Sequence, residues 1–306
     1  MYPWLNKVFQ QLSQRIQRQQ LHHGILLQGV EGLGKAHFAK ALADFLLCQK
    51  PENGQSCGEC QGCRLLAAQS HPDMLEVRRE KSQIGVDQIR QAIQQLTQTA
   101  QMSGNKVLII YEAETLNQAS SNALLKTLEE PTDHTYIILV SHQPQRLLPT
   151  ILSRCEKITL QPPALKDGVA WLQQQGEFAA VEEVLALCSL APLAALALLE
   201  QEEGLNYLEF TQQIQALQQL QISAVSLADA WQKQALQVVH WLQYWLSHNM
   251  RCQPQTWQQH AWPLHEKLLA ASKQLQNTGV NSVLILANLL SLLPALNVTA
   301  QSVKEG

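Results

Sequence analysis

One short segment constrains the fold of this chain more than any other: Gly29-Val30-Glu31-Gly32-Leu33-Gly34-Lys35-Ala36. It matches the phosphate-binding loop pattern G-x-x-x-x-G-K-[ST] at every position except the last. The apolar run Gly24–Gln28 before it predicts a short buried strand, and residues 36–47 behind it predict a helix. Because strand, loop and helix follow in the order that the motif requires, the sequence predicts a P-loop inside an α/β domain.

The residues of this loop suit phosphate binding, with one exception. Gly29, Gly32 and Gly34 permit the turn that points backbone N–H groups inward, and Lys35 is placed to reach phosphate oxygens. A working loop ends in a serine or threonine whose hydroxyl coordinates Mg²⁺. Ala36 stands at that position and has no oxygen to offer.

A second contact to the same ion is also missing. The predicted strand Lys106–Ile110 leads into Tyr111 and Glu112, and Tyr111 occupies the place of the aspartate that helps hold Mg²⁺ in P-loop ATPases. Glu112 lies where a carboxylate would polarise water, but without the metal it has little to act upon. Ser141, after a further predicted strand, suits either a γ-phosphate sensor or a turn cap. We therefore predict a vestigial loop that does not bind ATP productively.

The pattern of predicted elements divides the chain into three parts. Strands alternate with helices across the first half, which predicts a parallel sheet covered by helices on both faces. The strand pattern stops at Leu160, and Pro162-Pro163 marks a boundary. We predict an α/β domain over residues 1–161, a small helical domain over 162–204 and an all-α domain of long amphipathic helices over 205–306.

Composition and charge exclude several classes of protein. A hydrophobic fraction of 46% with 15% charged residues indicates a folded globular chain, and a formal net charge of −3 argues against a strong basic field for nucleic acid. The start of the chain lacks the apolar core of a signal peptide, and its longest apolar run, 282–296, is interrupted by polar residues and a proline. We predict a cytoplasmic protein without a membrane partner.

Tryptophans gather in the last third of the chain. Residues 206–306 carry no basic stripe, so we predict that these tryptophans anchor a helical core and its interfaces rather than stack on bases. The five are Trp231, Trp241, Trp245, Trp257 and Trp262.

Four of the seven cysteines lie close together, with the spacing C-x8-C-x2-C-x2-C: Cys48, Cys57, Cys60 and Cys63. Four thiolates on a compact insert, 48–63, suit tetrahedral Zn²⁺ in a closed, structural site. An iron–sulfur cluster is the competing assignment, although the cysteine-proline pair of that motif is absent. His71 is an alternative ligand in place of Cys48, although Pro72 and Asp73 suggest a turn there.

Two further motifs resemble one protein family. Leu124-Leu-Lys-Thr-Leu-Glu-Glu-Pro131, followed by a strand and by Ser153-Arg154-Cys155, is similar to the signature of clamp-loader AAA+ subunits. The defective loop, the cysteine insert and Tyr111 resemble the members of that family that do not hydrolyse ATP. The resemblance implies an AAA+ module, a helical lid and a collar that joins a pentameric ring.

The resemblance also implies partners and a role for individual residues. The partners would be the gamma or tau ATPases and the delta subunit of a DNA polymerase III holoenzyme, with indirect contact to the sliding clamp and primer-template DNA. Arg154, preceded by Ser153, would act as an arginine finger in the ATP site of a neighbouring subunit. Taken alone, an arginine at a helix end is more often a solvated charge. Residues 189–195 lack the arginine with which active AAA+ subunits touch their own nucleotide.

Two other functions remain open from the sequence. The chain could be an active clamp-loader ATPase of the gamma or tau type, which Ala36 and Tyr111 oppose and which equilibrium binding of labelled ATP would decide. It could also be a zinc-dependent DNA-binding module, which would require affinity with a steep salt dependence.

Overall fold

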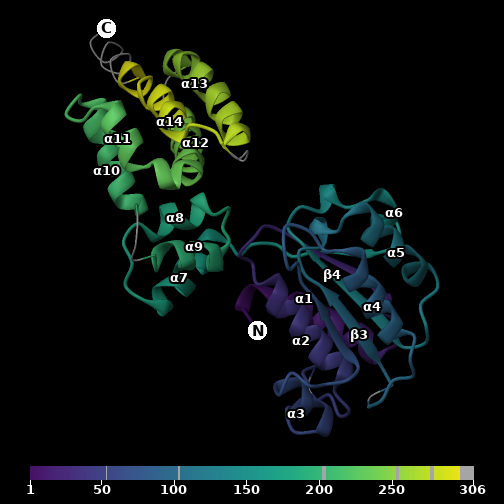
Figure 1. The fold of residues 1–306 in the computed structure, drawn as a ribbon. Helices are drawn as coiled ribbons and strands as arrows, with labels where there is room; N and C mark the ends of the chain where they lie inside the picture. The colour runs from purple at the N-terminus through teal and green to yellow at the C-terminus, as the bar shows by residue number, and fades with distance from the viewer. Residues whose placement is uncertain (53, 103, 202–204, 253–254, 276–278, 297–306) are drawn as a thin grey trace. The chain divides into compact units, whose positions relative to one another are not determined.

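The structure, a computed structural model, describes residues 1–52, 54–102, 104–201, 205–252, 255–275 and 279–296. The chain forms two compact units (Figure 1). The first comprises Met1–Gly168 with Ser189–Ala194, and the second Val169–Cys188 with Ala195–Gly306. The division into domains 1–161, 162–204 and 205–306 stays a prediction, and residues 297–306 of the last one lie outside the described residues.

The first unit is built on a five-stranded sheet in the order β2-β3-β4-β1-β5. Every neighbouring pair is parallel, which confirms the predicted sheet. The strands are β1 (Gly24–Gln28), β2 (Met74–Val77), β3 (Lys106–Ile110), β4 (Thr135–Ser141) and β5 (Glu156–Thr159).

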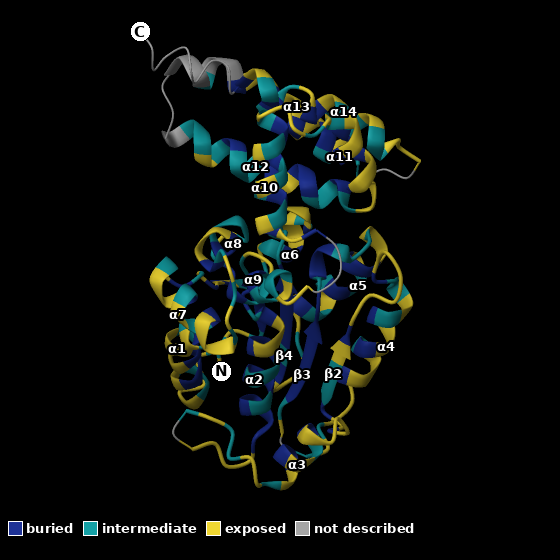
Figure 2. Cartoon of the chain, turned by 90° about the vertical axis from the view of Figure 1, so that its left-hand side faces the viewer, coloured by how far each residue is buried: buried dark blue, intermediate teal, exposed yellow. Residues whose placement is uncertain are grey.

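Helices cover both faces of this sheet (Figure 1). Side chains alternate along each strand, so apolar residues point to both faces and both must be covered. On one face, Ile25 and Leu27 share a core with Phe38 and Phe45. On the other, Leu26 packs in a core with Leu124 and others. The central strands are therefore buried on both faces and form dark blue ribbons in Figure 2. The helices of this unit are α1 (Asn6–Gln17), α2 (Lys35–Leu47), α3 (Gln61–Ala67), α4 (Val86–Leu96), α5 (Gln118–Glu129) and α6 (Pro149–Leu152), with short 3₁₀ turns at Pro3–Leu5, Ala113–Thr115 and Pro144–Arg146.

Strand β5 is absent from the predicted elements. It lies at the sheet edge beside β1, and only Ile158 among its residues is buried. An edge strand with one buried side chain carries no apolar run, so the sequence gives no strand signal there. Its place is fixed by tertiary contacts, including the ion pair of Glu156 with Arg15 at 2.6 Å.

The described residues of the second unit form helices joined by turns, without a strand, and have an aromatic core. Phe210 packs against Trp231 and Trp241, each 3% exposed, which confirms the predicted role of those two tryptophans. Trp262 is 54% exposed and takes no part in this core, so only its role at an interface stays a prediction. Trp257 lies outside the residues whose side chains are described. The helices are α7 (Leu165–Gln175), which begins in the first unit, α8 (Val181–Leu187), α9 (Pro192–Leu199), α10 (Tyr207–Gln218), α11 (Ala224–Ala230), α12 (Ala235–Cys252), α13 (Gln255–Gln274) and α14 (Ser282–Leu290), with a 3₁₀ turn at Gln232–Gln234. Among the described helices, none combines the length and apolar character needed to cross a bilayer.

A buried lysine ties several elements of the first unit together. Lys106, at the start of β3, is 6% exposed, and its Nζ donates to the carbonyl oxygens of Leu96 (2.6 Å) and Gln98 (3.0 Å) and to Thr132 Oγ1 (2.8 Å). The ammonium thereby caps the C-terminal end of α4 and joins it to the turn before β4.

We expect Lys106→Met to lower the free energy of unfolding by about 1–3 kcal/mol, because the buried carbonyl groups lose their donor. Urea titration followed by circular dichroism measures this change. Lys126→Met, at an exposed lysine of α5, is the matched control and should stay within about 0.5 kcal/mol of wild type. Equal effects of both substitutions would contradict the assigned role of Lys106.

Candidate functional site

The P-loop lies between β1 and α2, as predicted, but its lysine is already bonded. Lys35 is 7% exposed, and its Nζ donates to the carbonyl oxygens of Gly29 (2.9 Å) and Val30 (2.7 Å). Burial lowers the pKa of the Lys35 ammonium, and the negative charge of Glu114 opposes this shift. The ammonium group that would bind a phosphate thus donates its hydrogen bonds to carbonyl groups of the loop itself.

Other segments of the first unit pack directly on the loop. The N–H of Leu193 donates to the carbonyl oxygen of Gly32 (3.1 Å), and Trp4 Nε1 donates to that of Leu33 (3.0 Å). Gly32 has a φ of 79°, and a Cβ atom there would lie 2.4 Å from the Cβ of Ala194. The stretch that lacks an arginine therefore contacts the loop through backbone and small apolar groups.

The residues after β3 have partners of their own. Tyr111 is buried beneath the guanidinium of Arg78, 3.6 Å from the ring centroid, and burial raises the pKa of its phenol. The carboxylate of Glu112 pairs with Arg79 Nε at 2.5 Å. The carboxylate expected to polarise water is thus neutralised by an arginine of the same chain.

A buried acid beside this site has no signal in the sequence, where Glu114 looks like an ordinary surface residue. Its side chain is 2% exposed, and its Oε1 lies 2.8 Å from His142 Nδ1 and accepts the backbone N–H of His142 at 3.5 Å. Its Oε2 has no hydrogen-bond partner within the described residues. Ser141 Oγ accepts the N–H of Gln143 (3.2 Å), in keeping with a turn cap. A buried carboxylate that acts on Lys35 disfavours a second anion such as a polyphosphate.

Arg154 lies just beyond α6, and its guanidinium is held at the surface. Nη1 donates to the carbonyl oxygen of Thr150 (2.9 Å) and to Ser153 Oγ (3.3 Å), and Nη2 pairs with the carboxylate of Glu129 at the end of α5. The side chain is 34% exposed. This arrangement places a fixed, accessible guanidinium at the C-terminal ends of two helices.

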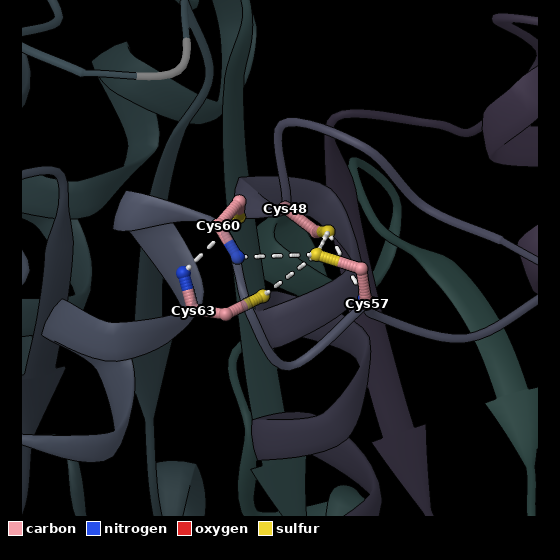
Figure 3. A group of neighbouring side chains, drawn as sticks. All are labelled: Cys48, Cys57, Cys60 and Cys63. Atoms are coloured by element: carbon pink, nitrogen blue, oxygen red, sulfur yellow. Dashed lines mark hydrogen bonds between the residues drawn. The ribbon is translucent and has the colours of Figure 1, made fainter.

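The four cysteines of the insert come together as their spacing predicts (Figure 3). Their sulfur atoms all lie within 4.8 Å of one another. Cys48 Sγ is 3.6 Å from Cys57 Sγ, which is 3.9 Å from Cys63 Sγ. Four sulfurs each ~2.3 Å from a tetrahedral zinc ion would be about 3.8 Å apart, so the donor set and its spacing fit the metal.

Backbone N–H groups point at these sulfur atoms. The N–H of Cys57 donates to Cys48 Sγ (3.3 Å), that of Cys60 to Cys57 Sγ (3.4 Å) and that of Cys63 to Cys60 Sγ (3.4 Å). Burial would raise the pKa of the Cys60 thiol, but the N–H groups of Cys63 and Gln49 lower it to about 6. Such bonds stabilise thiolates, the form that binds metal. The group of four sulfur atoms is complete without His71.

The chain matches known proteins over most of its length. The family model for "DNA polymerase III, delta subunit" matches residues 4–164. DNA polymerase III subunit delta' of Pseudomonas aeruginosa is 39% identical over 240 residues, which are 77% of this chain and 72% of the relative. The Escherichia coli subunit delta' is 40% identical over 57% of this chain and 53% of its own length, so the match spans about half of that relative.

The fold is similar to that of a solved structure. It is a DNA polymerase III gamma subunit-related protein of Thermotoga maritima, 19% identical, with a TM-score of 0.57 and coverage of 94% of this chain and 99% of the other.

We expect Gly32→Ala to destabilise the protein more than Gly104→Ala. Both glycines have a φ of 79°, so alanine brings about 1–2 kcal/mol of backbone strain at either position. Only Gly32 has Ala194 in the way, since nothing lies within 4 Å of a Cβ at Gly104, and the clash adds about 1–3 kcal/mol. Thermal and urea unfolding of both variants measures the difference, and equal losses would show that Ala194 does not rest on the loop.

Proposed function

The chain belongs to the DNA polymerase III delta-subunit family, and we propose that it is the non-hydrolysing delta' subunit of a clamp loader, which helps place a sliding clamp on primed DNA. The membership confirms the family resemblance drawn from the motifs at 124–131 and 153–155. The main support for the absence of ATP hydrolysis is that Lys35 forms hydrogen bonds with carbonyl groups of its own loop.

Several contacts support a lapsed nucleotide site. Ala36 and Tyr111 supply no ligand to Mg²⁺, and Glu112 is paired with Arg79. The buried Glu114 adds negative charge next to Lys35. An active ATPase of the gamma or tau type would have to break the contacts of Lys35 and Glu112 and would still lack the two ligands to Mg²⁺.

We assign to Arg154 the role of an arginine finger acting in a neighbouring subunit. A guanidinium stabilises the charge that develops on a transferring γ-phosphate. Arg154 is accessible and held by Glu129, a pair that is 34% and 48% exposed. Exposed pairs of this kind contribute only about 0.2–1 kcal/mol, so a phosphate can displace Glu129 without a large cost. Ser153 supports the finger through its hydroxyl oxygen.

The proposed function implies partner proteins and a cellular location. The chain would assemble with gamma or tau ATPases and with delta, and would reach the sliding clamp and primer-template DNA through that assembly. It would have no ATPase activity of its own while forming part of the polymerase holoenzyme. Such a subunit works beside the chromosome, in the cytoplasm.

We also propose that the cysteine insert binds one structural Zn²⁺ through Cys48, Cys57, Cys60 and Cys63. Four sulfur donors leave no open coordination position for substrate, so the metal would stabilise the insert rather than take part in a reaction. The N–H groups aimed at the sulfur atoms would hold the thiolates in place.

We expect Arg154→Ala to lower the DNA-stimulated ATPase rate of a loader reconstituted with gamma or tau, delta and this chain. Loss of an arginine finger slows its site about 10³-fold or more, so the total rate should fall by the share of that one site. Arg146→Ala, at an exposed arginine that bonds Gln143, is the matched control and should leave the rate unchanged. An unchanged rate for Arg154→Ala in a fully assembled complex would contradict the assignment.

Elemental analysis of the purified chain should find about one zinc per chain. Cys63→Ser should lose the metal and lower the melting temperature, because metal binding stabilises the folded insert. Cys188→Ser, outside the cluster, should keep both metal and stability. A visible iron chromophore in place of zinc would overturn the assignment.

A further inference from the structure

His71 lies between the cysteine insert and β2 and is 5% exposed. Its Nδ1 accepts the backbone N–H of Asp73 at 3.2 Å. An imidazole nitrogen that accepts a hydrogen bond carries no proton, so the proton of the neutral ring is on Nε2.

The Nε2–H of His71 is a buried hydrogen-bond donor that is left unsatisfied. It has no hydrogen-bond partner in the part of the chain that the structure describes, and it is closed to solvent. A buried donor left unpaired costs about 1–3 kcal/mol, so such a group needs an explanation.

The sulfur of Cys60 is the nearby group that metal binding would change. A Cβ atom at Gly62 would lie 2.9 Å from the carbonyl oxygen of Leu47, 3.6 Å from His71 Nε2 and 3.8 Å from Cys60 Sγ, so the absence of a side chain at Gly62 lets His71 and Cys60 approach the same point of the backbone. A metal-bound thiolate is a better hydrogen-bond acceptor than a thiol, because it carries negative charge.

We propose that His71 is an outer-shell hydrogen-bond donor of the metal centre, with its Nε2–H directed at the thiolate of Cys60. The inference rests on the metal site of the proposed function but not on the role in clamp loading. It makes His71 a positioning residue rather than a ligand.

The same histidine would join the metal centre to the sheet. The carbonyl oxygen of His71 accepts the N–H of Met74 (3.2 Å), and that of Asp73 accepts the N–H of Val107 (2.9 Å). The Asp73 carboxylate accepts the N–H groups of Gln101 (2.8 Å) and Met102 (2.8 Å). In this proposal, Nε2 of the imidazole donates to the metal centre, and Nδ1 accepts a hydrogen bond from the turn before β2.

Two substitutions separate these two nitrogen atoms. Asparagine can keep the acceptor at the place of Nδ1 but has no donor at Nε2, whereas glutamine can keep that donor and loses the acceptor. We expect His71→Asn to weaken Zn²⁺ binding about 10–100-fold in competition with a chromophoric chelator. His71→Gln should bind Zn²⁺ within about threefold of wild type and instead lose thermal stability, since the Asp73 N–H is left without its partner.

Cobalt substitution gives a readout that a purely structural role would not move. In full-length protein loaded with Co²⁺, the thiolate-to-metal charge-transfer band should shift to longer wavelength in His71→Asn and stay in place in His71→Gln. Equal zinc affinity and equal spectra for wild type and His71→Asn would overturn the proposal. A wild-type spectrum of mixed nitrogen and sulfur ligation would also overturn it, because His71 would then be a ligand.

If His71→Asn does not fold, wild-type protein loaded with cadmium-113 decides the matter by NMR. A scalar coupling between the metal and the His71 Nε2 proton supports the proposal, and its absence overturns it. A wild-type chain that binds neither Zn²⁺ nor Co²⁺ would instead refute the metal part of the proposed function.

Discussion

The hydrogen bonds of Lys35 to Gly29 and Val30 are the interaction on which the character of this site depends. In a phosphate-binding loop, the lysine and the backbone N–H groups together create a positive cavity. Here the ammonium neutralises the loop's own carbonyl dipoles, and Leu193 donates to the carbonyl oxygen of Gly32 from the outside. The carbonyl groups of Gly29, Val30, Gly32 and Leu33 are paired within the chain, and these bonds help the loop to keep its shape.

The charges around the loop are balanced in the same way. Arg78 lies over Tyr111, and Arg79 pairs with Glu112, so both residues that follow β3 have a basic neighbour. Glu114 is buried beside His142. Restoring a single hydroxyl at Ala36 would leave all of these contacts in place. The loss of hydrolysis in the proposed function is therefore distributed over several residues, and such a subunit can be rigid where an active ATPase must rearrange around its nucleotide.

The sequence predicts most where a pattern is local. Strands β1 and β3 are predicted to the residue, because both faces are buried and the apolar run is continuous, and the cysteine spacing brings four sulfurs together without any knowledge of the fold. It fails where burial depends on distant partners. Lys106 is buried only because Leu96, Gln98 and Thr132 meet it. The burial of Glu114 and the exposure of Trp262 could not be predicted, since neither leaves a mark on the neighbouring sequence.

The cysteine insert and Arg154, the arginine after α6, are both held in fixed positions. In the proposed function, Arg154 acts on a phosphate bound by a neighbouring subunit, so the chain needs no mobile site of its own but must hold this guanidinium in a fixed place. Arg154 is held by groups from two helices, and the core beneath them, with Leu124 and Ile151, is fully buried. A closed four-sulfur site would likewise fix the insert between α2 and β2, two elements of the same domain, by a metal rather than by a large apolar core. Both features restrict movement within the domain. A subunit that supplies one residue to the active site of a neighbour requires such rigidity, because that residue must lie in the correct position.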